Sequence, residues 1–509
     1  MVLSSLPSLI RIRQFIFTMV SDELFSVGQA VTAGLIACAG AFVYLLVKGY
    51  HARRTFYRLR QQEMPMPPWN SVLEHLLAVP PVMKTLPEDT QQPDAFEALC
   101  RANQKKDADS IIYLDMWPFA GPMMVICSPV LARSRALFNS GFSASYILQQ
   151  TPHIVDSAQV YVDVLRDYAR KGEMFSLDDA TCWYMMDVIG AVTLDARLHS
   201  QRQFNPLASA LRRQIRWHVL DNEWNLLIRW NPARPFVQRY NNEAAASSRS
   251  IIHLALASYM AQQKDKPRPK KLDSAFRDWA TVQIRLFLFA GHDSTSSTIC
   301  YCFYLLQSHP EAMAKLRAEH DAVFGTNITE TANMMRERPH LLNQLPYTTA
   351  AIKESLRLFP PASAMRGGQP GVYLQDDKGN RYPTEGTNMW ILHSAVQRNP
   401  KYWPSAMEFI PERWLAEPGD PLYPVKGGWR PFEHGPRNCL GQTLAMLDVK
   451  ITLALTVREF DIKHAYDEWD RLHPTSKVKS VNGERAYQTQ SGGAHPADGY
   501  PCRISLRKH

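Results

Sequence analysis

The sequence predicts a mainly α-helical fold with a small β domain, preceded by a transmembrane helix. Long runs with helical periodicity cover residues 154–199, Ser274–Gln307 and Gln442–Glu459. Strand patterns are short. Ile111–Cys127 alternates in polarity and is interrupted by a Gly-Pro turn, which is typical of a β-hairpin. Near the N-terminus, residues 24–47 contain no charged side chain. These three observations indicate a helical domain behind a membrane anchor.

The uncharged segment 24–47 is long enough to cross a hydrocarbon core of about 30 Å as a helix. More basic side chains follow it than precede it, and this bias places the bulk of the chain in the cytosol. A cleaved signal peptide is the alternative, but the run is too long and too internal and has no persuasive cleavage site. We therefore expect a non-cytosolic segment over 1–23, and a basic flank with a Pro-rich hinge over 48–69. The basic residues are Arg11 and Arg13 before the run, and Lys48, Arg53, Arg54, Arg58 and Arg60 after it.

Charge and cysteine usage exclude several classes of protein. The eight cysteines form no Cys-x-x-Cys pair, which suits a reducing, cytosol-facing domain rather than a disulfide scaffold. The net charge of +9 is moderate and accompanies no zinc spacing or nucleic-acid motif. It favours an anionic membrane or an acidic protein partner, and we expect no nucleic acid. The sequence also lacks a G-x-G-x-x-G or P-loop motif, so it offers no evident site for its own nicotinamide or flavin.

The segment Pro431–Leu444 carries the most specific chemistry of the chain. Its cysteine, Cys439, has an arginine two residues before it and an aromatic residue seven before it. A thiolate that ligates haem iron needs a tight loop, backbone N–H groups aimed at the sulfur and a cation for a haem propionate. The helix that follows favours a thiolate through its dipole, whereas a cysteine alone would suggest only a small buried hydrophobe. The candidates for the other tasks are Phe432 as a cover for the sulfur, Gly435 and Gly441 for the turn and the close approach to the porphyrin, and Arg437 for the propionate.

The string F-x-x-G-x-R-x-C-x-G resembles the haem-binding loop of the cytochrome P-450 family, and the resemblance extends over most of the chain from about residue 45 onward. It implies haem b as the cofactor, with Cys439 as the proximal ligand of the iron. It also implies one mostly helical haem-thiolate catalytic domain, which we expect over residues 70–509. Electrons would come from NADPH through a separate flavoprotein reductase, with cytochrome b5 as a further partner. Lys426 and Arg430 are candidates for a basic surface that meets the reductase.

One segment departs from the family pattern. In the family, the hairpin at Ile111–Cys127 is followed by a helix, a long substrate-contacting loop and a helix with W-x-x-x-R over a propionate. Here Val130 leads almost directly into LARSRALFNSGFSAS, so several tens of residues are missing. Arg135 matches the arginine of that helix, but Leu131 stands where its tryptophan is expected. Either the chain is truly shortened or the translation has lost an exon. The presence of one wall of the substrate pocket and of one propionate contact depends on which alternative holds.

The long helical run contains the stretch Ala290–Thr295, AGHDST. A glycine inside a helix costs about 1 kcal/mol relative to alanine, so its presence beside an acid and two alcohols asks for a reason. The resemblance implies that the distal helix opens here into a groove for dioxygen, and that Asp293, Ser294 and Thr295 help to deliver protons. Ser294 replaces the more usual threonine. The alternative is a polar N-cap cluster unrelated to catalysis, and we expect His292 to be packed or solvated rather than bound to iron.

Two further motifs support the cysteine loop. Glu354 and Arg357 lie three residues apart and therefore on one helix face. The resemblance implies that they join Arg413 in a buried network that holds the loop in register, with backbone carbonyls satisfying the surplus donors. Arg366, on the strand after this helix, matches a propionate-binding arginine. Residues 371–387 are predicted to form a hairpin with a Gly-Asn turn.

The function implied by the resemblance is a haem-thiolate monooxygenase that inserts one oxygen atom from O₂ into an apolar small molecule. The stretches FLFAGHDSTSSTICY and FIPERW are similar to enzymes of filamentous fungi that tailor polyketides and other secondary metabolites. We expect a single-pass protein of the endoplasmic reticulum membrane with its catalytic domain facing the cytosol. The aromatic and basic residues over 203–263 suit a face near membrane lipid, although a solvated helix face would have the same composition.

Two other functions stay open at this point. The first is a haem-thiolate isomerase or dehydratase that acts on a peroxide, and the retention of Asp293 beside an alcohol argues against it. The second is an inactive haem-binding protein or a truncated form, because the segment after Val130 is short.

Overall fold

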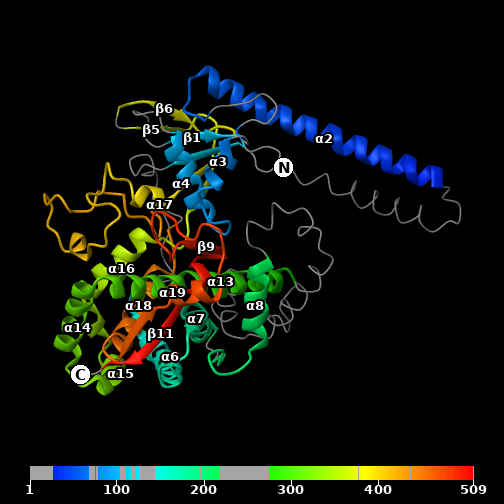
Figure 1. The fold of residues 1–509 in the computed structure, drawn as a ribbon. Helices are drawn as coiled ribbons and strands as arrows, with labels where there is room; N and C mark the ends of the chain where they lie inside the picture. Colours follow the sequence, from blue (N-terminus) through cyan, green and yellow to red (C-terminus); the bar gives the residue numbers. More distant parts are fainter. Residues whose placement is uncertain are drawn as a thin grey trace, which may run out of the picture. The chain divides into compact units, whose positions relative to one another are not determined.

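The chain divides into two compact units in a computed structural model. One consists of Met1–Met64 with Asp115–Pro122, and the other of Pro65–Leu114 with Met123–His509. All helices and strands of the described residues except α2 belong to the second unit (Figure 1). The structure describes residues 27–67, 75, 78–103, 111–115, 122–126, 144–194, 197–217, 274–376, 378–434 and 438–507.

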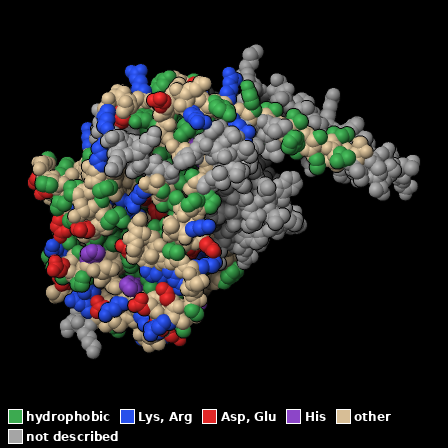
Figure 2. All heavy atoms as spheres, turned by 45° about the horizontal axis from the view of Figure 1, so that its top comes forward, with side chains coloured by type: hydrophobic (Ala, Val, Ile, Leu, Met, Phe, Trp, Pro, Cys, Tyr) green, Lys and Arg blue, Asp and Glu red, His purple; other side chains and the backbone are tan. Residues whose placement is uncertain are grey.

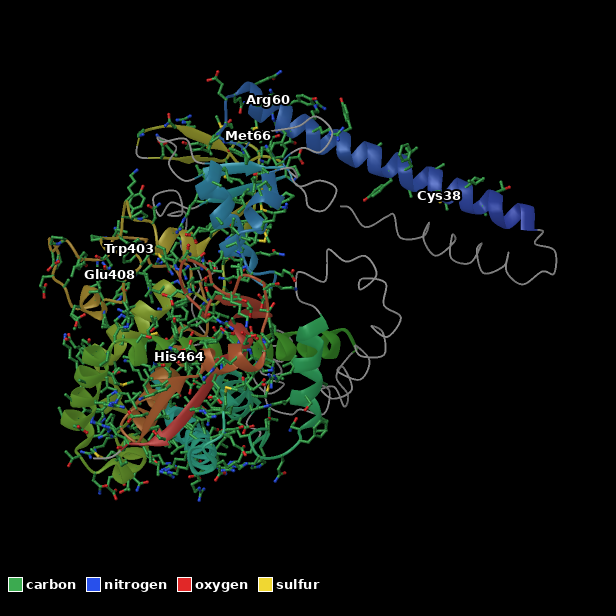
Figure 3. All side chains as sticks on the ribbon, viewed as in Figure 1. Cys38, Arg60, Met66, Trp403, Glu408 and His464 are labelled. Carbon is green, nitrogen blue, oxygen red and sulfur yellow. The ribbon has the colours of Figure 1, made fainter. Side chains whose placement is uncertain are left out.

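The first unit contains one long helix, α2 (Val27–Gln61). The apolar side chains of Leu35, Ile36 and Phe42 on it are exposed, and Arg60 lies in its last turn (Figure 3). Among the helices that the structure describes, none is long and apolar enough to cross a membrane. The predicted membrane span over 24–47 begins in residues outside the described part, and it stays a prediction.

A four-stranded sheet contains the predicted hairpin at Ile111–Cys127. Its strand order is β1 (Ile111–Leu114), β2 (Met123–Ile126), β7 (Asn388–Ile391) and β4 (Ala364–Gly367). Strands β1 and β2 are antiparallel, which confirms the hairpin, whereas β2 and β7 are parallel. The sheet therefore joins the N-terminal part of the second unit to the region just after residue 360.

Three smaller sheets complete the β structure of the described residues. Strands β5 (Tyr373–Gln375) and β6 (Arg381–Pro383) form the hairpin predicted over 371–387, and Gly379 in its turn has a φ of +86°. The other two bring the C-terminal region onto the helices. They are β9 (Gln488–Ser491) paired with β10 (Gly493–Pro496), and the order β3 (Phe175–Ser176), β11 (Pro501–Leu506), β8 (Phe460–His464).

The helical run predicted over 154–199 is confirmed as two helices, α6 (Thr151–Lys171) and α7 (Leu177–Leu194). Between them Gly172 adopts a left-handed φ of +61°, and its N–H donates to the carbonyl oxygen of Tyr168 at 3.0 Å. A residue with a side chain is strained in this conformation, so glycine ends α6 here.

Helix α13 (Ser274–Ser308) is the longest helix of the second unit within the described residues, and the other core helices pack around it (Figure 1). It contacts α7, α16 (Pro346–Leu358), α18 (Gln442–Thr456) and strand β10. Apolar side chains from α6, α7, α13, α16 and α18 form one continuous core. The other α-helices of the second unit within the described residues are α3 (Val79–Met83), α4 (Gln92–Asn103), α5 (Ala144–Gln149), α8 (Pro206–Trp217), α14 (Pro310–Phe324), α15 (Thr331–Glu337), α17 (His393–Gln397) and α19 (Tyr466–Leu472).

On the one face that Figure 2 shows, the charged side chains of the described residues are dispersed. On the face in Figure 2, lysine and arginine side chains lie among aspartates and glutamates. Several predicted features fall outside the described residues: the segment from Val130 through Leu131 and Arg135, most of 203–263, and the loop residues Gly435 and Arg437.

Candidate active site

Cys439 lies in the loop directly before α18. Its N–H donates to the carbonyl oxygen of Phe432 at 2.8 Å, and this bond closes the loop. The N–H groups of Gly441 and Gln442, at the start of α18, donate to the cysteine sulfur. Partial burial raises the pKa of the thiol, and these two N–H groups act in the opposite direction. The side chain is exposed, so its sulfur is accessible from outside the loop.

Phe432 and Gly441 flank this sulfur in sequence. The ring of Phe432 packs against the core and meets Trp429 edge-on, with ring centroids 5.8 Å apart. A Cβ added at Gly441 would lie 3.8 Å from Sγ of Cys439. Glycine at 441 therefore leaves free the space beside the sulfur that a methyl group would fill.

Arg366 lies on β4, and its guanidinium meets a carboxylate of the chain itself. Its Nη2 atom is 3.3 Å from Oε2 of Glu433. Glu433 also accepts hydrogen bonds from Nε of Arg430 at 2.9 Å and from Nε2 of His393 at 3.0 Å. Burial would raise the pKa of Glu433, but the hydrogen bonds from His393 and Arg430 outweigh it and lower that pKa to about 2. Glu433 thus holds a full negative charge next to the predicted propionate-binding arginine.

The prediction that Arg430 belongs to a reductase-facing surface is wrong. Its side chain is only 2% exposed, because it is held against Glu433. Its positive charge is therefore compensated inside the protein. Lys426, the other candidate, is exposed.

Glu354, Arg357 and Arg413 lie together in the interior, and all three side chains are 0% exposed. Arg357 donates to both carboxylate oxygens of Glu354, from Nε at 2.9 Å and from Nη2 at 2.8 Å. Nε of Arg413 donates to Oε1 of Glu354 at 3.0 Å. The structure therefore brings the three residues of the predicted network into direct contact.

Most of the surplus donors of this network reach the segment 397–414, which begins at the last residue of α17. The remaining N–H groups of Arg357 donate to three backbone carbonyls, and Arg413 donates to another, that of Ser405. The ring of Trp403 lies 5.2 Å from the Arg357 guanidinium carbon, and Glu408 supplies one of the three carbonyls (Figure 3). These contacts tie an irregular segment to α16 over most of its length.

The stretch Ala290–Thr295 stays α-helical, so the expected local opening of α13 is not seen there. Ser294 Oγ donates to the carbonyl oxygen of Ala290, one turn earlier, at 3.0 Å. Gly291 has a packing reason instead: an added Cβ would lie 2.3 Å from Cδ1 of Ile189 on α7. Glycine at 291 therefore lets α13 and α7 approach closely.

The side chains around Gly291 differ in their surroundings. His292 is buried and its Nδ1 lies 2.8 Å from the carbonyl oxygen of Leu288, and burial lowers its pKa. It is packed, as predicted. Thr295 is also buried, whereas Ser294 is partly exposed.

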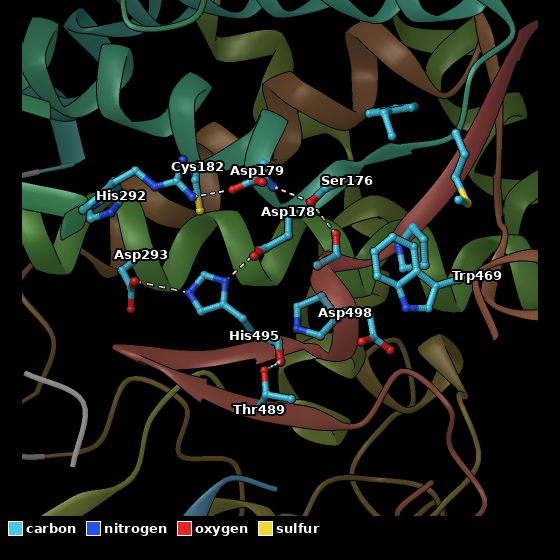
Figure 4. Close-up of a pocket in the computed structure, with 16 residues that line it drawn as sticks. Ser176, Asp178, Asp179, Cys182, His292, Asp293, Trp469, Thr489, His495 and Asp498 are labelled. Carbon is cyan, nitrogen blue, oxygen red and sulfur yellow. Dashed lines mark hydrogen bonds and ion pairs between the residues drawn. The ribbon is translucent and has the colours of Figure 1, made fainter. Parts of the chain in front are cut away.

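Asp293 is held by the C-terminal strand β10 (Figure 4). The N–H of Gly493 donates to its Oδ2 atom, and Nε2 of His495 lies 3.2 Å from its Oδ1 atom. The other ring nitrogen of His495, Nδ1, is 2.7 Å from Oδ1 of Asp178 on α7. Burial would lower the pKa of His495, but the two carboxylates outweigh it and raise that pKa well above its usual value. Burial likewise opposes the ionisation of Asp293, yet His495 keeps the pKa of Asp293 low.

Sequence reasoning missed Asp178, His495 and Glu433. His495 is 317 residues from Asp178 and 202 from Asp293 along the chain. No spacing rule connects positions so far apart, and each residue type is unremarkable where it stands. Only the folded C-terminal hairpin brings His495 to Asp178 and Asp293.

The donors around Cys439 fit a haem. A single accessible sulfur with two N–H groups directed at it is the arrangement that stabilises an iron-bound thiolate. The space beside it, which a Cβ at position 441 would enter, and the partly exposed Arg366 suit a flat ligand that carries carboxylates. The residues present therefore match the cofactor that the sequence implies.

Comparisons with known proteins identify the family of the chain. A family model described as "Cytochrome P450" matches residues 91–490. The protein named "Cytochrome P450 monooxygenase polC" of Polytolypa hystricis (strain UAMH7299) is 40% identical, with 92% of this chain and 94% of that protein covered. "Cytochrome P450 monooxygenase acrF" of Aspergillus aculeatus (strain ATCC 16872 / CBS 172.66 / WB 5094) is 31% identical, with 74% of this chain and 82% of that protein covered.

The alignment with polC spans 532 positions, more than the 509 residues of this chain, so it contains positions that this chain lacks. Among solved structures, the "Crystal structure of cytochrome P450DA heme domain" superposes with a TM-score of 0.61. It covers 87% of this chain and 98% of that chain at 18% identity, and it supports the fold alone. On the family model and the two fungal relatives, this chain belongs to the cytochrome P450 family of monooxygenases.

Proposed function

We propose that this chain is a membrane-anchored haem-thiolate monooxygenase of fungal secondary metabolism, which inserts one oxygen atom from O₂ into an apolar small molecule. Membership of the family supports the class of reaction. The fungal relatives, each named as a monooxygenase, support the metabolic setting.

The observation that carries the proposal is the loop at Cys439. Its sulfur is accessible and receives two backbone N–H groups, which would stabilise the thiolate as an anionic ligand of iron. Haem b, when bound, supplies the redox chemistry that activates dioxygen. Cys439 would hold the iron. The guanidinium of Arg366, which contacts Glu433, would also form an ion pair with a haem propionate. The Glu354 network would keep the segment that leads to the loop in a fixed place.

The proposed roles on α13 belong to Asp293, Ser294 and Thr295. Ser294 has a hydroxyl on a partly exposed surface of the helix and already takes part in a hydrogen bond, to Ala290. Asp293 is ionised by its contact with His495, so it accepts a proton before it can pass one on. We assign to Ser294 the hydroxyl nearest the reaction, with Thr295 as the neighbouring alternative.

Electrons must come from outside the chain, because the family uses a redox partner. We propose an NADPH-dependent flavoprotein reductase, with cytochrome b5 as a second donor, and exposed Lys426 as part of the basic surface that meets it. The uncharged run 24–47 with its basic flank would anchor the protein in the endoplasmic reticulum membrane, with the catalytic domain in the cytosol.

The test uses the full chain in microsomes with a reductase, NADPH and ¹⁸O₂. Candidate fungal polyketides and related apolar metabolites are added, and the products are analysed by mass spectrometry. We expect a product that gains one ¹⁸O atom and depends on NADPH, and no such product from Cys439→Ala. A product that forms without NADPH and gains no atom from O₂ would show an isomerase or dehydratase and contradict the proposal.

A further inference from the structure

A cavity of about 410 Å³ lies beside the Asp293 site, on the side of α7 and the C-terminal hairpin (Figure 4). Its lining includes Asp178, Asp179, Arg212, Asp293, His495 and Asp498. Nothing in the predicted proton-delivery motif accounts for such a charged cavity. His292 and Asp293 of that motif line the cavity directly, and beside them lies His495, which is only 4% exposed and contacts Asp293.

His495 bridges two elements that are distant in sequence. Nδ1 is 2.7 Å from Asp178 on α7, and Nε2 is 3.2 Å from Asp293 on α13. The strand that carries it is fastened to α13 by close backbone contacts. A Cβ added at Gly493 would lie 2.5 Å from Oδ2 of Asp293, and Ser297 donates to the carbonyl oxygen of Ala494. The ring therefore has little freedom to leave either carboxylate.

A metal ion is a poorer explanation of this cluster than a proton. Asp178, Cys182 and His495 present ligand atoms within 4.8 Å of one another. A cation bound there would have to displace the thiol proton of Cys182, whose pKa burial raises to about 12. It would also have to displace the proton that His495 holds between two carboxylates. The imidazolium of His495 already places one positive charge between the two carboxylates.

We propose that His495 is a positioning residue for Asp293: it holds the Asp293 carboxylate against β10 and passes protons to it from the adjoining cavity. This inference rests on the proposed monooxygenase function. In the step, the Nε2 proton of His495 moves to Oδ1 of Asp293, so an ion pair becomes a neutral imidazole beside a carboxylic acid. After Asp293 gives this proton to the hydroxyl assigned to proton delivery on α13, a hydronium ion in the cavity protonates Nε2 again and is left as water. One proton is moved, and no electron is transferred.

The surroundings of His495 fit a path for single protons. Asp178 faces Nδ1 and keeps the ring oriented, while Arg212 on α8 is paired with Asp179 at 2.5 Å rather than with His495. His292 is buried beside Asp293 with a lowered pKa and so adds no positive charge. The charged and titratable groups that face His495 from the surrounding elements are Asp178, Asp179 and Cys182 on α7, Arg212 on α8, His292 and Asp293 on α13, and Asp498 near the cavity.

The first experiment measures how NADPH oxidation divides between product and hydrogen peroxide in the holoenzyme with its reductase. His495→Gln removes the ring protons but keeps a polar side chain, and we expect a several-fold larger peroxide fraction and a larger solvent deuterium effect. Asp178→Asn should give a smaller change in the same direction. Asp179→Asn is the matched control, because Asp179 is a neighbouring carboxylate on the same cavity that pairs with Arg212 instead. Its peroxide fraction should equal that of the wild type.

The second experiment needs no turnover. A histidine whose folded-state pKa is raised stabilises the protein below its unfolded pKa of about 6.5, and this stabilisation is lost as pH rises through the folded-state pKa. The melting temperature of the wild type should therefore exceed that of His495→Gln most at pH 6 and converge with it as the pH is raised. A difference that is the same at every pH would show a neutral ring and overturn the inference.

The two readouts separate the failure of the inference from that of the proposed function. If the wild type forms product with little peroxide and His495→Gln, with normal haem content, does the same, the role of His495 is refuted and the monooxygenase stands. If the wild type binds haem but never consumes NADPH with substrate, the proposed function fails and the inference fails with it. A raised peroxide fraction in Asp179→Asn equal to that in His495→Gln would likewise refute a specific path through His495.

Discussion

Replacing Glu354 with glutamine should destabilise the fold and the cysteine loop together. The carboxylate accepts five hydrogen bonds, two from Arg357 and one each from Arg413, Trp414 and the backbone of Ile410. Glutamine keeps the shape of the side chain but removes the negative charge. It also puts an NH₂ group where one carboxylate oxygen accepts hydrogen bonds.

The magnitude follows from burial. Arg357 and Arg413 are both 0% exposed, so neither guanidinium can recover hydration when its carboxylate is lost. Removing one partner from a buried ion pair costs about 3–5 kcal/mol. Since domains are stable by about 5–15 kcal/mol, Glu354→Gln should lose a large part of the free energy of unfolding.

The assay is denaturant unfolding of the purified protein, together with its haem content per mole. Glu412→Gln is the matched control, because Glu412 is 42% exposed and pairs with Lys315 at 2.7 Å on the surface. An exposed pair of this kind is worth less than about 1 kcal/mol. If Glu354→Gln binds haem normally and loses no more stability than Glu412→Gln, the buried network does not support the loop.

Three other substitutions test separate parts of the structure. Burial raises the pKa of Asp448 on α18 to about 7, against the hydrogen bond from Tyr184. In the unfolded chain the Asp448 carboxyl ionises near pH 4, so its contribution to the free energy of unfolding falls by about 4 kcal/mol between pH 4 and 7. The stability of Asp448→Asn relative to the wild type should therefore rise with pH, as measured by unfolding at pH 5 and pH 8. Gly291→Ala should destabilise by about 1–3 kcal/mol, since its Cβ would meet Ile189 at 2.3 Å, measured by thermal unfolding. Ser294→Ala should raise peroxide release per NADPH consumed if its hydroxyl relays protons.

Each of these has a result that contradicts it. A stability difference between Asp448→Asn and the wild type that does not change with pH would mean that this carboxyl is ionised in the folded protein. If Ile189→Ala, which removes both side-chain carbons that would lie within 3 Å of the new Cβ, fails to relieve Gly291→Ala in the double variant, the steric explanation for the glycine is wrong. Unaltered coupling in Ser294→Ala would move the proposed hydroxyl role to Thr295.

The sequence predicted those parts of the fold that depend on local pattern. The hairpins at Ile111–Cys127 and 371–387 follow from alternation and turn residues, and the end of α6 follows from Gly172. The Glu354 network was predicted through the family resemblance, because its three residues belong to motifs with known partners. Local chemistry and motif content sufficed in these cases.

Features that depend on tertiary neighbours were missed or misjudged. Arg430 is indistinguishable in sequence from an exposed basic residue, and only its contact with Glu433 shows that it is buried. Gly291 was expected to open α13, yet it serves close packing against Ile189, a residue about a hundred positions away. Asp293 was assigned as an acid without the partner that sets its charge, because His495 approaches it only through the folded C-terminal hairpin.

The most direct test of the account is the carbon monoxide difference spectrum of the reduced, full-length protein beside that of Cys439→His. The accessible sulfur with two N–H groups directed at it predicts the Soret band typical of thiolate-ligated ferrous haem in the wild type. The variant should lose that band and show the spectrum of nitrogen-ligated haem or none. A wild type that takes up no haem, or a variant that keeps the thiolate band, would contradict the assignment of Cys439 as the ligand.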